Sequence, residues 1–81
     1  MKPIFLGGFI AELEALPDTV QKKFYKQMDF LIRNLRHPSL RAKKFHEGEG
    51  IWQARVDIHY RFYFQIDGDR YILLNIKRHK D

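Results

Sequence analysis

Two arginines in adjacent apolar runs have the residue type and spacing to bind an anion. Arg55 lies in the run Trp52–Val56, and Arg61 lies in the run Tyr60–Ile66. With the period of two of a β-strand, both arginines fall on the polar side of their runs and project from the same open face of a sheet. A guanidinium stays protonated near neutral pH and can hold two oxygens of one phosphate. The pair is therefore a candidate phosphate site.

The loop between the two runs decides whether these arginines face each other. An even-length loop is excluded, because opposed residues of an antiparallel pair point to the same side. A three-residue loop, Asp57-Ile58-His59, would place Arg55 opposite Arg61, which costs stability unless an anion lies between them. A loop from Ile58 to Tyr60 would instead set Asp57 opposite Arg61 as an ion pair. The sequence leaves both registers open.

The other reactive side chains do not form a cofactor site. Four histidines show no metal-ligand spacing, and the absence of cysteine excludes a disulfide or a thiolate zinc site. The turn Asp67-Gly68-Asp69 lacks the rest of a calcium loop, and no glycine-rich phosphate loop follows a strand. We expect no metal and no nucleotide cofactor.

Length and charge narrow the class of protein. A chain of 81 residues has room for a single domain, residues 1–81, and 44% hydrophobic residues favour a folded core. No apolar segment is long enough to span a membrane, and the lack of cysteine fits a cytoplasmic protein. The net charge of +5 favours a polyanionic partner, either nucleic acid or an acidic protein.

The hydrophobic pattern predicts an α+β fold. A first strand at Lys2–Leu6 precedes a helix that Pro17 ends, and a second helix spans about Thr19 to Leu35 with one buried stripe. Three strands then form an antiparallel meander, and the helices pack on one face of the sheet. The predicted stripe consists of Val20, Phe24, Met28, Leu31 and Leu35. On the last strand, Ile72, Leu74 and Ile76 are expected to face the core, and Leu73 is a misfit on the open face.

A basic segment separates the helices from the meander. No acidic residue occurs between Asp29 and Glu47, and we interpret the stretch between the second helix and Gly50 as a loop. Its uncompensated cations, with the end of the helix included, are Arg33, Arg36, Arg41, Lys43 and Lys44.

Several segments together resemble the RelE/ParE superfamily of bacterial toxins. They are the helix boundary LPDTVQKKF, the segment HPSLRAKKF, the strand pair QARVDIHYRFYFQIDGD and the ending ILLNIKRHKD. The resemblance covers essentially the whole chain. It implies a toxin held inactive by a cognate antitoxin. In the RelE branch the toxin cleaves mRNA in the ribosomal decoding site, in contact with ribosomal RNA, whereas in the ParE branch it inhibits DNA gyrase.

The resemblance also implies roles for particular residues. Arg55, Arg61 and His79 match functional positions of the family. Metal-free RNA cleavage by the ribose 2′-hydroxyl needs positive charge on the phosphate and a group that accepts a proton. Arginine suits the first task, and His79 is the predicted proton carrier because histidine titrates near neutral pH. The predicted RNA-binding residues are Arg41, Lys43, Lys44, Tyr63, Lys77 and Arg78.

Two departures from the RelE pattern favour weaker nuclease activity. Gln53 stands where RelE-like nucleases often carry another basic residue, and the chain ends at Asp81, before the tyrosine that often follows. These departures keep a gyrase inhibitor, or a catalytically silent antitoxin-binding module, as the alternative.

Overall fold

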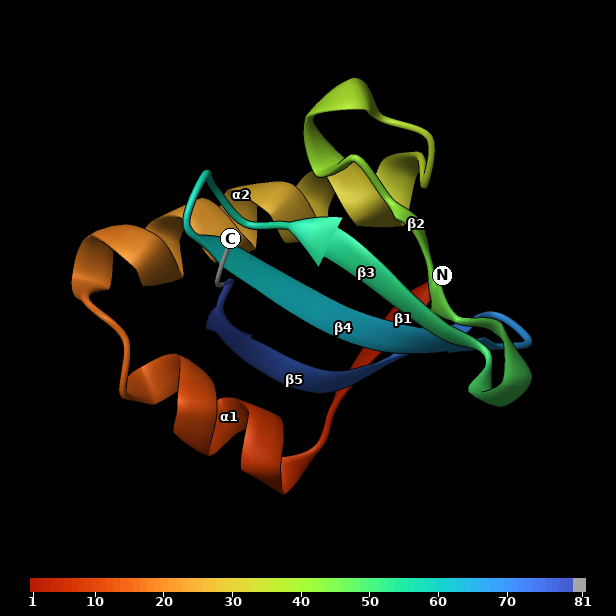
Figure 1. The fold of residues 1–81 in the computed structure, drawn as a ribbon, viewed down its shortest axis with the longest axis horizontal. Helices are drawn as coiled ribbons and strands as arrows, with labels where there is room; N and C mark the ends of the chain where they lie inside the picture. The colour runs from red at the N-terminus through yellow and green to blue at the C-terminus, as the bar shows by residue number, and fades with distance from the viewer. Residues whose placement is uncertain (80–81) are drawn as a thin grey trace.

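A five-stranded sheet and two α-helices make up most of the structure, a computed structural model that describes residues 1–79 (Figure 1). The strands lie in the order β1-β5-β4-β3-β2; β1 runs parallel to β5, and all other neighbours are antiparallel. The strands are β1 (Lys2–Phe5), β2 (Lys43–His46), β3 (Ile51–Arg55), β4 (Tyr60–Asp67) and β5 (Arg70–Arg78). The helices are α1 (Gly7–Glu14), α2 (Asp18–Arg33) and the short 3-10 helices η1 (Pro38–Leu40) and η2 (Glu47–Glu49). The predicted α+β order is confirmed.

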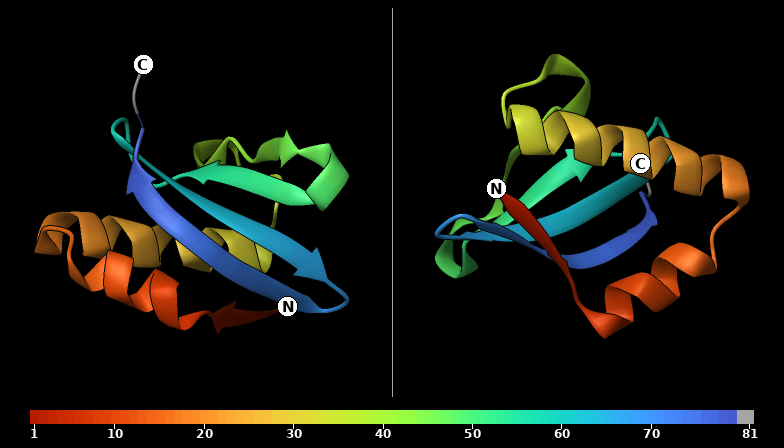
Figure 2. Two further views of the ribbon diagram at one scale, coloured as in Figure 1. Left: turned by 60° about the horizontal axis from the view of Figure 1, so that its bottom comes forward. Right: turned by 180° about the vertical axis from the view of Figure 1, so that it is seen from behind.

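Both α-helices lie on the same side of the sheet, as predicted. Figure 1 shows α2 behind the sheet and α1 below it, and the view from behind in Figure 2 brings the helices to the front of the sheet. The core between the layers contains fully buried aromatic rings, among them Phe9, Phe24, Phe62 and Phe64. The other face of the sheet is therefore available for binding. No helix within residues 1–79 is long and apolar enough to cross a membrane.

Helix α2 presents the predicted apolar stripe to the sheet. Val20, Phe24, Met28 and Leu31 are buried, and Leu35 packs against the core just after the helix ends. Gln27 is also buried on this face, although its polar side chain gave no reason to expect it there. A buried amide must find hydrogen-bond partners, so Gln27 marks a polar contact inside the molecule.

The basic segment contains a strand that the sequence analysis missed. Residues 43–46 form β2, which pairs with β3 at the edge of the sheet, so the interpretation of this stretch as a loop was wrong. All four of its side chains are exposed. An exposed edge strand lacks the apolar alternation by which a strand is recognised, which explains the omission.

A β-bulge reverses the expected faces of part of β5. Tyr63 pairs with Asn75, whereas its neighbour Phe64 pairs with Leu73, so Leu74 is an extra residue on β5. The bulge turns Tyr71 and Leu73 into the core together with Ile76. The expected inward orientation of Ile72 and Leu74 was wrong, because one inserted residue shifts the alternation of side chains before it.

Candidate functional site

The β3–β4 hairpin places the two arginines side by side. Arg55 pairs directly with Arg61, and the N–H of Val56 donates to the carbonyl of Tyr60 at 3.0 Å, so the loop is Asp57-Ile58-His59. This confirms the first of the two registers. The alternative, with Asp57 opposite Arg61, is wrong.

Asp57 serves the loop instead. Its carboxylate accepts hydrogen bonds from the backbone N–H groups of His59 (2.8 Å) and Tyr60 (2.9 Å), and it forms an ion pair with Lys23 on α2 at 3.4 Å. Burial alone would raise the pKa of Asp57, but the two backbone hydrogen bonds and Lys23 outweigh it and lower the pKa below its ordinary value. The hairpin tip is thereby tied to the helix layer, and neither arginine has an ion pair with a carboxylate within residues 1–79.

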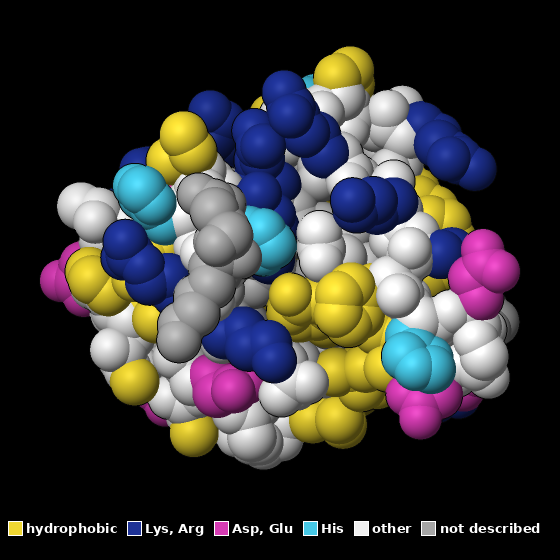
Figure 3. Space-filling view, in the orientation of Figure 1, with side chains coloured by type: hydrophobic (Ala, Val, Ile, Leu, Met, Phe, Trp, Pro, Cys, Tyr) yellow, Lys and Arg dark blue, Asp and Glu magenta, His cyan; other side chains and the backbone are white. Residues whose placement is uncertain are grey.

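A basic cavity opens on the face of the sheet away from the helices. Its volume is about 320 Å³, and its lining consists of Arg41, Lys43, Gln53, Arg55 and Arg61. Figure 3 shows Lys and Arg side chains gathered over the upper part of this face, beside an apolar patch. Among the described residues, four cations and one amide, with no acidic side chain, make up this lining, and such a set has the chemistry to bind an anion. We call this site the basic cavity.

The two arginines of the basic cavity are held differently. One Nη atom of Arg61 donates to the backbone carbonyls of Asp57 (2.8 Å) and Tyr60 (3.1 Å), which fixes its guanidinium on the hairpin. The Nε atom of Arg55 is buried and has no hydrogen-bond partner. Burial lowers the pKa of Arg55, and the charges of Arg41 and Arg61 lower it further, against a small opposing effect of Asp57. An anion in the cavity would relieve both the repulsion and the unmet donor.

Gln27 connects the helix layer to Arg55, which lines the basic cavity, and to Ser39, two residues before Arg41. Its amide nitrogen donates to the carbonyl of Arg55 at 2.8 Å and to that of Ser39 at 3.0 Å, and its amide oxygen accepts from the Ser39 hydroxyl at 3.1 Å. Ser39 belongs to η1, which His37 caps by accepting the Ser39 N–H at 3.2 Å. Arg41 follows with a left-handed backbone at φ 47°, a conformation uncommon for a residue with a side chain. This turn directs the chain from η1 into β2 and brings Arg41 to the cavity.

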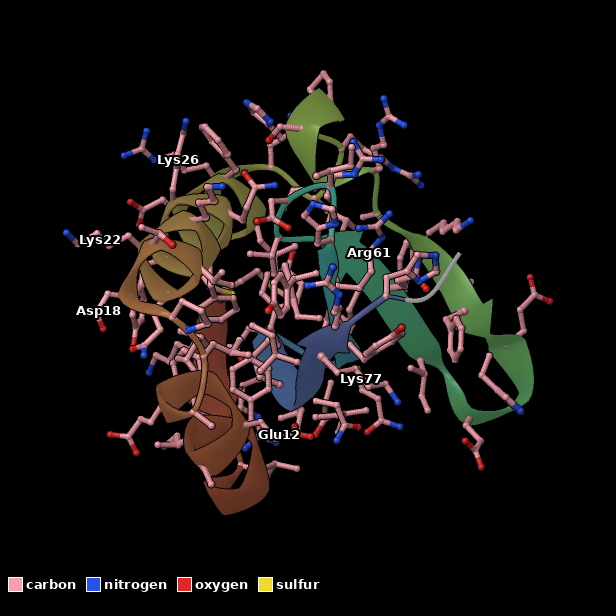
Figure 4. The ribbon with its side chains drawn as sticks, turned by 60° about the vertical axis from the view of Figure 1, so that its left-hand side comes forward. Glu12, Asp18, Lys22, Lys26, Arg61 and Lys77 are labelled. Carbon is pink, nitrogen blue, oxygen red and sulfur yellow. The ribbon has the colours of Figure 1, made fainter. Side chains whose placement is uncertain are left out.

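The other predicted RNA-binding residues divide between the two faces of the sheet. Lys77 pairs with Arg61 and lies over the ring of Tyr63, with Nζ 5.4 Å from its centroid. Figure 4 shows Arg61 and Lys77 on the open side, whereas Lys22 and Lys26 extend from the far side of α2. Lys44 and Arg78 alternate to the opposite side of their strands, where they lie over Trp52 (5.8 Å) and Tyr60 (5.9 Å). These two cations do not line the basic cavity.

Tyr63 lies on the predicted face, but other side chains cover it. Only 8% of it is exposed, because Phe45 packs edge-on against it at 4.9 Å between ring centroids and Lys77 lies over it. Phe45 itself is 58% exposed. Phe45 was not among the predicted site residues. Its place two residues after Lys43 suggests the same face of a strand, and the contact with Tyr63 establishes that face, although the pairing of β2 with β3 is irregular between Lys44 and His46.

His79 lies just beyond β5, outside the lining of the basic cavity. Its backbone N–H donates to the carbonyl of His59 at 2.7 Å, which ties it to the tip of the β3–β4 hairpin. It follows Lys77 by two residues, and Lys77 pairs with Arg61, so the chain brings His79 to the same end of the sheet as the arginines. The cavity lining within residues 1–79 contains no acid and no histidine.

Comparison with known proteins agrees with this arrangement of sheet and helices. A family model described as the ParE toxin of the type II toxin-antitoxin system parDE matches residues 4–81. The chain belongs to this family of toxins, and hence to the RelE/ParE superfamily that its sequence resembles. A search of curated proteins returned no match.

Solved structures with the same fold are distant in sequence. A YoeB/ParE toxin from Agrobacterium tumefaciens superposes with a TM-score of 0.82 at 15% identity, covering 99% of this chain and 100% of the other. YafQ from Escherichia coli gives 0.79 at 15% identity, with 96% and 92% covered. The RelBE2 toxin-antitoxin complex from Mycobacterium tuberculosis gives 0.76 at 19% identity, with 96% of each chain covered. At these identities the likeness concerns the fold alone.

Proposed function

We propose that this toxin is a ribosome-dependent mRNA endonuclease that holds the scissile phosphate in the basic cavity. The observation that carries the proposal is the unpartnered, buried Nε of Arg55 in a cavity lined by four cations and no acid. Unpaired cations that are partly removed from water destabilise the folded state, and a phosphodiester supplies a negative charge that compensates them. The net charge of +5 also favours RNA as the ligand, because a cationic protein attracts the phosphate backbone.

The reaction requires no metal in this proposal. The ribose 2′-oxygen attacks the neighbouring phosphorus and loses its proton to a base, while the bond to the 5′-oxygen breaks and that oxygen takes up a proton. The products are a 2′,3′-cyclic phosphate and a 5′-hydroxyl. Arg55 and Arg61 stabilise the charge that builds on the phosphate oxygens. His79 is the proposed proton carrier, because it is the histidine that follows the strand bearing Lys77, the partner of Arg61.

The proposed RNA contacts outside the cavity follow the open face. Arg41, Lys43 and Lys77 would bind the RNA backbone, because their charges surround the phosphate site. Lys44 and Arg78 are the weaker candidates, since each lies over an aromatic ring on the other side of its strand.

Purified protein added to programmed ribosomes tests the proposal directly. We expect discrete cuts at decoding-site codons, and a loss of about 100-fold or more in rate for Arg61→Ala, because one preorganised charge contact is removed. His79→Ala should slow cleavage by a similar factor and change its pH profile. Lys26→Ala is the matched control, a cation on the outer side of α2 (Figure 4), and should cleave at the wild-type rate. Intact mRNA with the wild-type protein rules out the nuclease.

A second candidate is inhibition of DNA gyrase without chemistry. Membership of the ParE family favours it, as does a cavity lining in which the described residues include no acid and no histidine. In this version the basic cavity binds an acidic surface or DNA backbone. Supercoiling by purified gyrase distinguishes the candidates, since a gyrase inhibitor blocks it at excess toxin and an RNA-cleaving toxin leaves it unchanged.

The proposed protein partner is a cognate antitoxin. Solved structures with this fold include toxin-antitoxin complexes from Staphylococcus aureus and Mycobacterium tuberculosis. We propose that the antitoxin brings an acidic or amphipathic segment to the open basic face or to the helix pair. Co-expression with the adjacent reading frame should yield a complex that weakens as salt rises, because screening reduces the attraction.

A further inference from the structure

Phe45 is an exposed aromatic ring beside the basic cavity, and it lies outside the hydrophobic core. It is 58% exposed, more than any other aromatic side chain within residues 1–79. It packs against Tyr63 with an angle of 61° between the ring planes, an edge-to-face contact. This contact supports the ring from one side and leaves most of its surface in water.

The position of Phe45 relates it to the phosphate site. Lys43 lines the basic cavity and lies two residues before Phe45 on β2, a separation of about 7 Å along a strand. Gln53, also in the lining, pairs with Lys43 on one side and with Tyr63 on the other. The aromatic pair and the cavity are thus neighbours on one continuous surface, at a spacing that one nucleotide can bridge.

The charge around Phe45 favours an anionic ligand. Lys77 lies 5.4 Å from the Tyr63 centroid, and Lys43 and Arg61 border the cavity next to it. Glu47, two residues after Phe45, and Glu49 belong to η2, directly after β2, where Glu49 lies 4.0 Å from His46. Along β2, the cavity cation Lys43 therefore precedes Phe45 and the carboxylates follow it. An aromatic ring among cations is the combination that binds the bases and phosphates of a single-stranded nucleic acid.

We propose that Phe45 is a stacking platform for an unpaired RNA base whose neighbouring phosphate occupies the basic cavity. Tyr63 supports the platform from below, and Lys77 holds Tyr63 in place. This inference rests on the proposed RNA substrate and adds how the site recognises the nucleotide: a base adjacent to the scissile phosphate must leave the stack of its neighbours. Stacking accepts any base, so the platform contributes affinity and positioning.

Binding of short fluorescent RNA tests the platform separately from cleavage. We expect Phe45→Ala to bind a single-stranded hexanucleotide about tenfold more weakly than wild type, and Phe45→Trp to bind as well as wild type. Tyr25→Ala is the matched control, because Tyr25 is a 54% exposed aromatic residue on α2 and should not affect RNA binding. With an abasic hexamer of the same charge, wild type and Phe45→Ala should bind equally.

Phe45→Trp also supplies a direct signal. The natural tryptophan, Trp52, lies against Lys44 and Phe64 on the other side of β3. The additional tryptophan fluorescence should be quenched by RNA and unaffected by the abasic hexamer.

Equal affinity of Phe45→Ala and wild type for RNA would overturn the platform, as would an equal loss of affinity with the abasic hexamer. If Phe45→Ala loses antitoxin binding alone, the ring is a protein contact. The ribosome assay shows separately whether the nuclease proposal fails. In that case mRNA on ribosomes stays uncut, although RNA binding still depends on Phe45.

Discussion

Strand β4 presents Phe62 and Phe64 to the helices and Arg61 and Tyr63 to the open face. On the helix side, Phe62 and Phe64 are fully buried, and Phe62 meets Phe24 edge-on at 5.3 Å between ring centroids. On the open side, Arg61 faces Arg55 across the hairpin, and the described part of the chain places no carboxylate in the cavity that they line.

The difference between the faces separates stability from binding. Buried aromatic rings gain hydrophobic and dispersion free energy on folding, and the helix side therefore holds the molecule together. The opposed arginines destabilise the folded state, since like charges repel and Arg55 is partly removed from water. The folded state tolerates this repulsion because burial of aromatic rings on the helix side stabilises it by more than the opposed arginines destabilise it. Stabilisation of the open face itself would come from a bound anion.

Phe62→Ala should produce the largest effect on this comparison. Removing a fully buried ring leaves a cavity and should lower the free energy of unfolding by about 3–5 kcal/mol. Urea unfolding followed by circular dichroism measures the loss. Phe45→Ala, which removes the same side chain from the open face, should change stability by about 0.5 kcal/mol or less. Similar losses in both variants would contradict the division between the faces.

Gln27→Met should break the connection between the faces. The methionine keeps the length of the side chain but leaves the carbonyls of Arg55 and Ser39 without their donor, at a cost of about 1–3 kcal/mol. Because Arg55 lines the basic cavity and Ser39 lies two residues before Arg41, which also lines it, the variant should also bind inorganic sulfate more weakly. Thermal unfolding with and without sulfate measures both effects.

Gln65→Met is the control for Gln27. Its amide makes one exposed hydrogen bond, to the carbonyl of Glu49 at 2.8 Å. We expect stability and sulfate binding close to those of wild type. A wild-type response to sulfate in Gln27→Met would show that the amide supports the fold without shaping the cavity.

Arg55→Met should sharpen the contrast with a smaller effect of opposite sign. An apolar side chain of similar length removes the repulsion by Arg41 and Arg61 and the unpartnered Nε, so the free energy of unfolding should rise by about 1 kcal/mol. Sulfate should raise the Tm of wild type and have little effect on the variant. Arg33→Met, at the exposed end of α2, should keep the wild-type sulfate response. A less stable Arg55→Met would mean that Arg55 supports the fold.

Asp57 should add the smallest effect, confined to acid pH. Its folded-state pKa is lowered, so its contribution to stability is complete above its ordinary value of 3.8 and is lost as the pH falls through the lower folded-state value. Asp57→Asn should therefore unfold with a flatter pH dependence below about pH 4. Asp67→Asn, which removes an exposed ion pair with Arg70, should keep the wild-type slope. If the free energy of unfolding depends on pH equally in wild type and Asp57→Asn, Asp57 does not stabilise the hairpin.

The sequence alone determined much of the scaffold. Hydrophobic periodicity placed both helices and the β3–β4 hairpin, because burial of one face imposes a period of 3.6 on a helix and of two on a strand. The parity of the loop reduced the hairpin to two registers, both with Arg61 on the open face. The family followed from the order of these elements together with the residues at their ends.

Tertiary structure decided the rest of the site. Contact with Tyr60 and Lys23 turned Asp57 into a loop anchor and so selected the register that opposes the arginines. The hydrogen bonds of Gln27 and the bulge at Leu74 involve segments that are distant along the chain, and no local pattern specifies such partners. The left-handed turn at Arg41 likewise shows no signal in the sequence. Pairing of β2 with β3 placed Phe45 beside the basic cavity. Residue types and periodicity therefore determine which side chains face out, whereas long-range hydrogen bonds and strand pairing decide which of them meet.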